Sequence, residues 1–182
     1  MTTDNPTVTP WRIGPTDYPE SGSLHERMRF LLRYAALAPS SHNTEPWRFR
    51  VQDNQIDVLI DFSRWLKVAD DDQRELHISV GCALENLLIA VEHFGLGHNV
   101  EYLPNYEDSS LAASVTLSEP SEPSSIRPPI LFEMITVRHT NHQAYESRPV
   151  PQEILERFQS LCVEDGLHLF LTSDPDTKPA GR

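Results

Sequence analysis

The sequence predicts a mixed fold of helices and strands, of the α/β or α+β class. Helical and strand-like patterns alternate along its 182 residues, as they do in mixed folds. Two strand-like segments, 47–53 and 56–62, are separated by a short polar turn, which is typical of a hairpin or of two neighbouring strands. A helical pattern that is apolar nearly all round runs from Arg74 to Phe94, and such a helix is buried on most sides. At roughly 150 residues per domain, the length predicts one domain.

The composition restricts the classes of partner. The formal net charge is −12, so the surface repels the phosphates of nucleic acids and of anionic membranes, and we expect neither as a partner. No run of about 18 apolar residues is present, so no transmembrane helix is expected. The first residues lack the basic-then-apolar order of a signal peptide, which predicts a cytoplasmic protein. Cys82 and Cys162 form no motif, so neither a disulfide nor a metal site is expected.

The first expected elements are an arm and a helix. Residues 1–22 are rich in Pro, Thr, Asp and Gly, and they predict a loose arm. Ser23 and Glu26 have the spacing of a capping box, and apolar residues at helical spacing follow them. Pro39 disfavours the helical conformation of the residue before it, so the helix is expected to stop there.

Three aspartates, Asp70 to Asp72, precede the long apolar helix. Because the spacing of an EF-hand loop is absent, they predict an acidic helix start rather than a calcium site. Gly95 and Gly97 predict the end of the helix. Two further strands are expected after it, over 98–104 and 111–119.

The last third of the chain begins with an expected linker. In the segment 118–129, four of the twelve residues are proline and four are serine. The segment 130–150 starts with a helical pattern and ends as a loop. An amphipathic helix over 151–166 and a strand over 167–173 complete the predicted elements.

The loop APSSHNTEPW, over 38–47, is the candidate binding segment. Its prolines restrict the backbone near both ends, which lowers the cost of ordering it around a ligand. The Asn43 amide can both donate and accept hydrogen bonds, and the hydroxyls of Ser40 and Ser41 can do the same. The alternative is a helix C-terminal turn in which these side chains satisfy backbone groups, and the loop by itself favours that alternative.

Two motifs resemble those of the FMN-dependent nitroreductases. The loop APSSHNTEPW resembles their pattern A-P-S-S-x-N-x-Q-P-W, and GCALENLLIAVEHFGLG resembles their long central helix. The order and the separation of the two motifs also match, within residues 23–117. A third segment, RHTNH over 138–142, resembles the R-x-S/T-x-R motif whose side chains hold the FMN phosphate. Its place in mid-chain is similar to the Acg group, whose longer chains contain two tandem half-repeats.

The resemblance implies an α+β fold, with an antiparallel-type sheet packed with helices around a long central apolar helix. It divides the chain into an N-terminal arm (1–22), a first nitroreductase-like repeat (23–117), a Pro/Ser linker (118–129) and an incomplete second repeat (130–182). In this fold the flavin sits at a subunit or repeat interface. The resemblance therefore implies a homodimer, with the helix over 74–94 at the interface.

The resemblance also implies a set of FMN contacts, with no catalytic residue assigned and no metal. The expected flavin contacts are Ser40, Ser41 and Asn43, and the expected phosphate contacts are Arg138, Thr140 and His142. Glu45 stands where the family has Gln, and His142 where it has a second Arg. A neutral histidine binds an anion less well than an arginine. The alternative for 138–142 is a solvated helix end whose basic residues face the helix dipole.

The function implied is that of an FMN-dependent oxidoreductase. It would transfer hydride or electrons from NAD(P)H to a small organic acceptor such as a nitroaromatic or a quinone. Because the flavin supplies this chemistry, the absence of a catalytic dyad is compatible with the function. Two alternatives remain: a flavin-binding or sequestering protein without turnover, and a truncated remnant that acts as an interaction module.

Overall fold

The computed structural model describes residues 9–105, 107–120, 124–144, 146, 148–161 and 168–172. The chain divides into two compact units, Met1–Thr140 and Asn141–Arg182, and each is considered separately. The boundary lies after Thr140, so residues 130–140, which follow the expected linker, belong to the first unit. The repeat boundaries that the resemblance implies stay a prediction.

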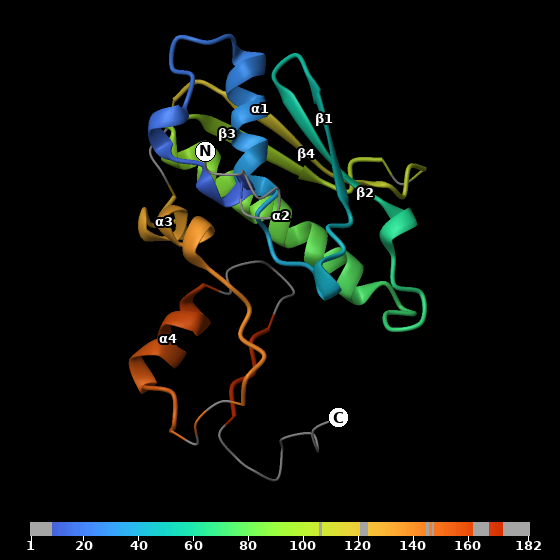
Figure 1. The fold of residues 1–182 in the computed structure, drawn as a ribbon, viewed down its shortest axis with the longest axis vertical. Coiled ribbons are helices and arrows are strands. Elements are labelled where there is room, and N and C mark those ends of the chain that lie inside the picture. Colours follow the sequence, from blue (N-terminus) through green and yellow to red (C-terminus); the bar gives the residue numbers. More distant parts are fainter. Residues whose placement is uncertain are drawn as a thin grey trace, which may run out of the picture. The chain divides into compact units, whose positions relative to one another are not determined.

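The first unit contains a four-stranded sheet in the order β1-β2-β4-β3 (Figure 1). The strands are β1 (Trp47–Gln52), β2 (Gln55–Ile60), β3 (Gly97–Tyr102) and β4 (Leu111–Ser118). Every neighbouring pair is antiparallel, which confirms the predicted hairpin and the two later strands. Antiparallel strands together with separate helices make an α+β fold, as the resemblance implies.

Two helices, α1 (Leu24–Ala35) and α2 (Arg74–His93), lie against this sheet (Figure 1). The capping box predicted for α1 is present. The Ser23 hydroxyl accepts a hydrogen bond from the Glu26 N–H at 3.3 Å, and the Glu26 carboxylate accepts one from the Ser23 N–H at 2.8 Å. These bonds satisfy N–H groups that a helix start leaves without partners.

The aspartates before α2 act as its cap. The Asp70 carboxylate accepts hydrogen bonds from the Glu75 and Leu76 N–H groups, each at 2.8 Å. The Asp72 carboxylate accepts one from the Arg74 N–H at 3.1 Å. The acidic cluster therefore binds the helix start, as its position in the sequence predicts.

One face of the sheet supplies the core. Ile56 pairs with Val115 and Val58 pairs with Ala113, and all four side chains are at most 1% exposed. Paired residues project to the same side of a sheet, so these side chains form one apolar strip. The helices α1 and α2 cover the apolar side.

The helix α2 is buried along most of its C-terminal half. Its buried residues are Leu76, Ser79, Val80, Ala83, Leu84, Leu87, Leu88, Ile89, Ala90, Val91 and Glu92. Its N-terminal half presents a freer surface, where Ile78 is 50% exposed and nothing lies within 4 Å of the Cβ position of Gly81. Gly95 follows the helix with a φ of +72°, a conformation that favours glycine, and this agrees with the predicted helix end.

The described part of the N-terminal arm is packed, which corrects the expectation of a loose arm for these residues. It contains two short 3₁₀ helices, Thr9–Arg12 and Pro15–Asp17. Ile13 is buried, and the Tyr18 ring stacks on Phe94 with 4.1 Å between ring centroids. Burial of these two side chains stabilises the packed conformation, although the polar composition of the arm predicts a loose one. Residues 1–8 lie outside the described residues.

The helix α3 (Ile130–Val137) completes the described part of the first unit. Phe132 and Ile135 are buried, and α3 contacts α2. The Phe132 ring stacks on His93 with 3.5 Å between centroids, and it lies 4.7 Å from Tyr34. Aromatic packing therefore fixes this short helix to the two longer ones.

The second unit contains the helix α4 (Gln152–Ser160). It lies within the predicted amphipathic segment, whose closing Gly166 and whose Cys162 lie outside the described residues. The strand expected over 167–173 is wrong for the described residues 168–172, which have no strand conformation. A strand is stable only when it is paired, and no described segment pairs with this one.

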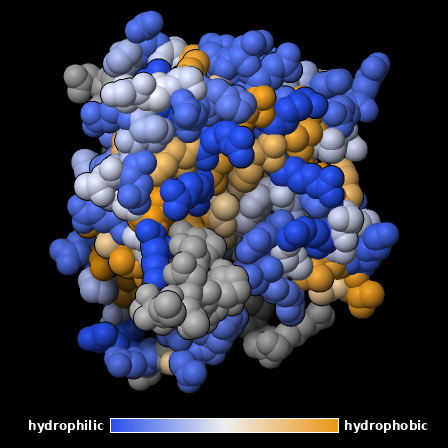
Figure 2. Space-filling view, turned by 45° about the horizontal axis from the view of Figure 1, so that its top comes forward, coloured by the Kyte–Doolittle hydropathy of each residue, from blue (hydrophilic) through white to orange (hydrophobic). Residues whose placement is uncertain are grey.

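Hydrophilic residues dominate the visible face in a space-filling view, and hydrophobic residues are seen in patches between them (Figure 2). Within the described residues, none of the helices has the length and apolar character needed to cross a membrane.

Candidate functional site

The loop between α1 and β1 has a strained backbone. His42, Asn43 and Glu45 all have positive φ angles, of 51°, 54° and 48°. Asparagine tolerates this left-handed conformation better than most residues, whereas histidine and glutamate adopt it less readily. A short turn closes the loop, with hydrogen bonds from the Asn43 N–H to the Ser40 carbonyl and from the Thr44 N–H to the Ser41 carbonyl. Backbone strain of this kind is concentrated at functional sites.

The two serines of the loop are engaged in holding it. The Ser40 hydroxyl accepts a hydrogen bond from the Glu45 N–H at 2.9 Å. The Ser41 hydroxyl donates to the Glu75 carboxylate at 2.6 Å, and the Ser41 N–H donates to the Ser79 hydroxyl at 3.2 Å. Ser41 thus ties the loop to the first turns of α2. The Ser40 hydroxyl accepts in its bond and so keeps its own proton to donate.

Asn43 is the loop side chain with the greatest freedom to bind. It is exposed, and its amide makes no hydrogen bond with another described residue. A free amide offers two donors and an acceptor to a ligand. His42 and Glu45 are exposed as well, so both can meet solvent.

Arg138 lies at the start of this loop. Its Nη2 donates to the Leu37 carbonyl at 3.4 Å, and Leu37 stands three residues before Ser40. Its Nη1 donates to the Thr140 hydroxyl at 3.3 Å, and its guanidinium carbon lies 5.9 Å from the centre of the Trp11 ring. The fold therefore brings Arg138 to Leu37, the residue before the predicted flavin loop, and a hydrogen bond joins Thr140 to Arg138.

The remaining predicted phosphate contact, His142, is an exposed residue of the second unit. Its role stays a prediction.

Cys82 lies within the electrostatic reach of Arg138. Burial raises the pKa of the Cys82 thiol, and the Arg138 guanidinium opposes that effect only in part. A thiol with a raised pKa stays protonated at neutral pH and reacts poorly. This agrees with Cys82 as a small apolar side chain rather than a reactive one.

A hollow lies beside the loop on the side of the α2 start. Its cavity volume is about 10 Å³, and it is lined by Ser41, Thr44, Arg64, Leu66, Asp70, Leu76 and Ser79. Pockets that enclose small molecules are larger, roughly 300 to 1,000 Å³. The hollow is too small for a flavin.

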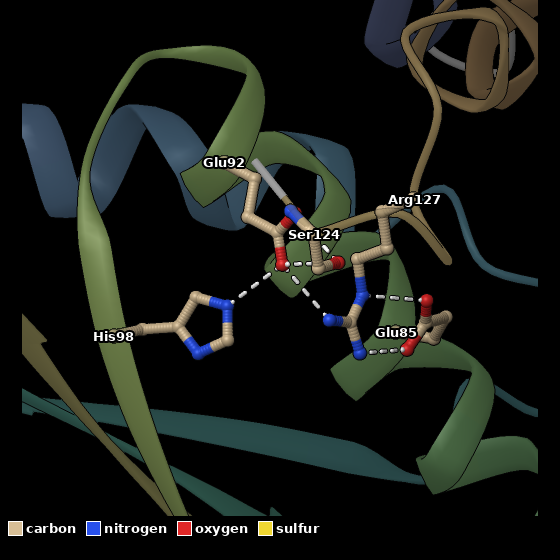
Figure 3. Close-up of polar contacts among 5 residues, drawn as sticks. All are labelled: Glu85, Glu92, His98, Ser124 and Arg127. Carbon is tan, nitrogen blue, oxygen red and sulfur yellow. Dashed lines mark hydrogen bonds and ion pairs between the residues drawn. The ribbon is translucent and has the colours of Figure 1, made fainter. Parts of the chain in front are cut away.

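A second polar cluster lies on the C-terminal half of α2 (Figure 3). The Arg127 guanidinium donates two hydrogen bonds to the Glu85 carboxylate, at 2.8 and 2.9 Å, and a third to Glu92 at 2.8 Å. The Ser124 N–H donates to Glu92 at 2.8 Å. The His98 Nε2 lies 3.0 Å from the same carboxylate. The segment expected to be a plain linker is thus fastened to α2.

The charges in this cluster compensate each other in a buried place. The side chains of Arg127 and Glu92 are 11% and 6% exposed. Burial raises the pKa of Glu92, but hydrogen bonds from His98, Ser124 and Arg127 outweigh it, and the pKa lies below its ordinary value. Burial lowers the pKa of Arg127, and the Glu85 and Glu92 carboxylates outweigh that effect and raise it. Both groups are therefore charged at neutral pH.

Sequence reasoning missed this cluster. Two signals could have found it: Glu85 and Glu92 are carboxylates seven apart in the mostly apolar part of the helix, and Arg127 is the one basic residue of the segment 118–129. Residues seven apart in a helix lie on the same face, because seven residues make nearly two turns. Among the described residues, no group of histidines, cysteines or carboxylates could hold a metal ion.

Comparison with known proteins found relatives for most of the chain, although no family model matches it. It is 32% identical over 136 residues, 75% of its length, to the Mycobacterium tuberculosis protein named "Putative NAD(P)H nitroreductase Rv3131". It is 24% identical over 161 residues, 88% of its length, to "Putative NAD(P)H nitroreductase acg" from the same species. The alignments cover 38% and 48% of those proteins, so the chain spans about half of their length or less.

Comparison with solved structures gave matches with TM-scores below 0.5. One from Desulfovibrio desulfuricans, described as a "putative nitroreductase in complex with fmn", is 21% identical, with a TM-score of 0.46 over 82% of this chain and 100% of that chain. One from Bacteroides thetaiotaomicron, described as "Putative NADH dehydrogenase/NAD(P)H nitroreductase", is 20% identical, with a TM-score of 0.46 over 57% of this chain and 80% of that chain.

Proposed function

From the relationship of this chain to the nitroreductase family, and within it to the Acg-like proteins, we propose that it is an FMN-binding oxidoreductase. It would pass electrons from NAD(P)H to a small organic acceptor such as a nitroaromatic or a quinone. The observation that carries the proposal is the position of Arg138, whose guanidinium meets the Leu37 carbonyl at the start of the loop 38–47.

The donors present fit the phosphate of FMN. A phosphate binds best to a planar guanidinium, which offers several N–H donors in a fixed geometry. Arg138 is half-buried and Thr140 is exposed, and a hydrogen bond holds the two side chains together. Because the formal net charge of the chain is −12, a dianionic phosphate needs a local cation of this kind.

The loop fits the polar edge of the flavin ring. The exposed Asn43 amide can donate to a ring carbonyl and accept from a ring N–H. The Ser40 hydroxyl can donate a further hydrogen bond. The Ser41 hydroxyl is already bonded to Glu75, so its main contribution is to hold the loop in place. When bound, FMN would take hydride from NAD(P)H and pass on the electrons, and these residues would bind and orient it.

His42, Asn43 and Glu45 of the loop are exposed, so a further protein surface can approach the loop. We propose that this surface belongs to a second copy of the chain, with the helix α2 at the interface, as the resemblance implies. The exposed Ile78 and the uncovered Gly81 support this, because both can pack against an approaching surface. The acidic charge supports small molecules rather than nucleic acid or membrane as the other partners. The cytoplasmic location stays a prediction.

A second candidate is a flavin-binding protein without turnover. Glu45 favours it, because a carboxylate has no donor for the ring and brings negative charge near the flavin. The two candidates differ in one property, the transfer of electrons through the bound cofactor.

The test is the visible absorbance spectrum of the purified protein, before and after FMN is added in excess. We expect flavin bands that stay with the protein through gel filtration, that are bleached by NADPH or NADH, and that recover with a quinone. Retained flavin without bleaching would support the second candidate. No retained flavin would contradict both.

A further inference from the structure

The polar cluster on α2 is connected to Arg138 through one short helix. Glu85 and Glu92 lie two turns apart on one face of α2, and the guanidinium of Arg127 bridges them. Ser124 donates to Glu92 from the same segment. We refer to Glu85, Glu92, Ser124 and Arg127 as the Arg127 clamp. All four residues belong to the first unit, as Arg138 does.

The clamp fixes the point at which α3 begins. Arg127 is followed directly by Pro128 and Pro129, whose rings fix the φ angles of the chain. The Leu131 N–H donates to the Pro128 carbonyl at 2.9 Å, so the helix starts at once after the prolines. Little rotational freedom is left between the clamp and the first turn of α3.

The other end of α3 carries Arg138. The Arg138 N–H donates to the Met134 carbonyl at 2.9 Å, in the last turn of the helix. A helix of this length is not stable by itself, so its place depends on what holds it. It is held by the clamp before its start and by the buried Phe132 and Ile135 along its length.

We propose that the Arg127 clamp positions the Arg138 guanidinium at the flavin loop, and that Arg127 is therefore a positioning residue for the phosphate of FMN. This inference rests on the proposed function. It assigns a role in FMN binding to residues that do not contact the flavin. Without the clamp, the buried face of α3 would still pack on α2, but its start would be free to shift. Arg138 would then be placed to contact the phosphate in a smaller fraction of the protein molecules, and the affinity for FMN would fall in proportion.

The test compares FMN with riboflavin, which has the same ring and no phosphate. Dissociation constants for both are measured by quenching of flavin fluorescence, in the wild type and in the variants. A contact to the phosphate changes the affinity for FMN alone, whereas a general loss of structure changes both affinities. The ratio of the two constants therefore separates positioning from a merely structural role.

The variants remove either the contact or the clamp. Arg138→Gln should reduce the preference for FMN over riboflavin about tenfold, the value of one charge-assisted hydrogen bond. Arg127→Met should give the same loss, with the riboflavin affinity unchanged. Because Arg127→Met leaves the buried Glu92 carboxylate without its cation, the combined Arg127→Met and Glu92→Gln variant is measured as well, since removal of both charges is better tolerated. Arg29→Gln, at an exposed position of α1, is the matched control for charge and should keep the wild-type ratio.

The outcomes separate the positioning role of Arg127 from the proposed function. If the wild type prefers FMN, if Arg138→Gln loses the preference and if both clamp variants keep it, the positioning role is overturned and the proposed function stands. If both clamp variants lose it with Arg138→Gln, the role is supported. If the wild type binds both ligands equally or binds neither, the phosphate site itself is refuted, and the inference falls with it.

Discussion

The guanidinium of Arg138 donates a hydrogen bond to the carbonyl of Leu37, across 101 positions of sequence. This contact joins the end of α3 to the start of the loop between α1 and β1. Residues 138–140, the first part of the segment that resembles a phosphate motif, thus lie in the same compact unit as the segment that resembles a flavin loop. Neither segment by itself would make a convincing binding site.

The first prediction concerns the flavin ring. Asn43→Ala should weaken FMN and riboflavin to a similar extent, about five- to tenfold, because the amide would bind the ring and not the phosphate. Fluorescence quenching with both ligands measures this. His42→Ala, at the neighbouring exposed position, is the control and should change neither affinity. An Asn43→Ala variant with wild-type affinities would refute the ring contact.

The second prediction concerns the attachment of the loop to α2. Ser41→Ala removes the hydrogen bond from the Ser41 hydroxyl to the Glu75 carboxylate and should lower the free energy of unfolding by about 1 kcal/mol. Urea unfolding followed by tryptophan fluorescence measures the change. Glu75→Gln keeps an acceptor for the hydroxyl, so it should cost less than Ser41→Ala. Equal losses of unfolding free energy in the two variants would show that the hydrogen bond from the Ser41 hydroxyl is not what stabilises the loop.

The third prediction concerns stability in acid. Burial raises the pKa of Glu92, but its hydrogen bonds lower the pKa by more. In the folded protein the pKa of Glu92 therefore lies below the ordinary value for glutamate, which is about 4.3. The unfolded chain therefore binds a proton at higher pH than the folded one. The stability that Glu92 contributes is complete above its ordinary pKa and is lost as the pH falls through the lower, folded value.

Glu92→Gln tests this dependence. Its free energy of unfolding should be lower than that of the wild type at neutral pH, and the gap should narrow as the pH falls below about 4. Urea unfolding across this range measures both curves. A gap that stays constant with pH would show that Glu92 does not titrate as its contacts imply.

The fourth prediction concerns the packing of α3. Phe132 is 5% exposed and stacks on His93, so Phe132→Ala should lower the free energy of unfolding by about 3 kcal/mol. Met134 is 42% exposed on the same helix, and Met134→Ala should change it by less than about 0.5 kcal/mol. Thermal or urea unfolding gives both values. Similar losses for the two variants would mean that α3 does not pack through Phe132.

Most of the first unit could be predicted from local patterns. The capping box at Ser23, the apolar period of α2 and the alternation in the strands each depend on neighbours within a few residues. The strand expected over 167–173 fails for its described residues for the opposite reason. A strand pattern records which residues suit a pleated surface, but pairing requires an edge that the sequence does not reveal.

The candidate site divides in the same way. The loop 38–47 was recognisable because its residue types stand together in the chain. The sequence does not show that Ser41 is bonded to Glu75 whereas the Asn43 amide stays exposed. The backbone conformation of the loop decides which side chains turn back to the protein.

The sequence by itself determined the main helices and strands of the first unit, their order, the acidic charge and the segments that resemble a flavin site. Only the tertiary structure decided that Arg138 reaches the loop and that Arg127 fastens the supposed linker to Glu85 and Glu92. The physical reason is the range of the interactions. Propensity and periodicity act over a few neighbours, whereas an ion pair or a hydrogen bond between distant residues forms only after apolar packing has brought its partners together.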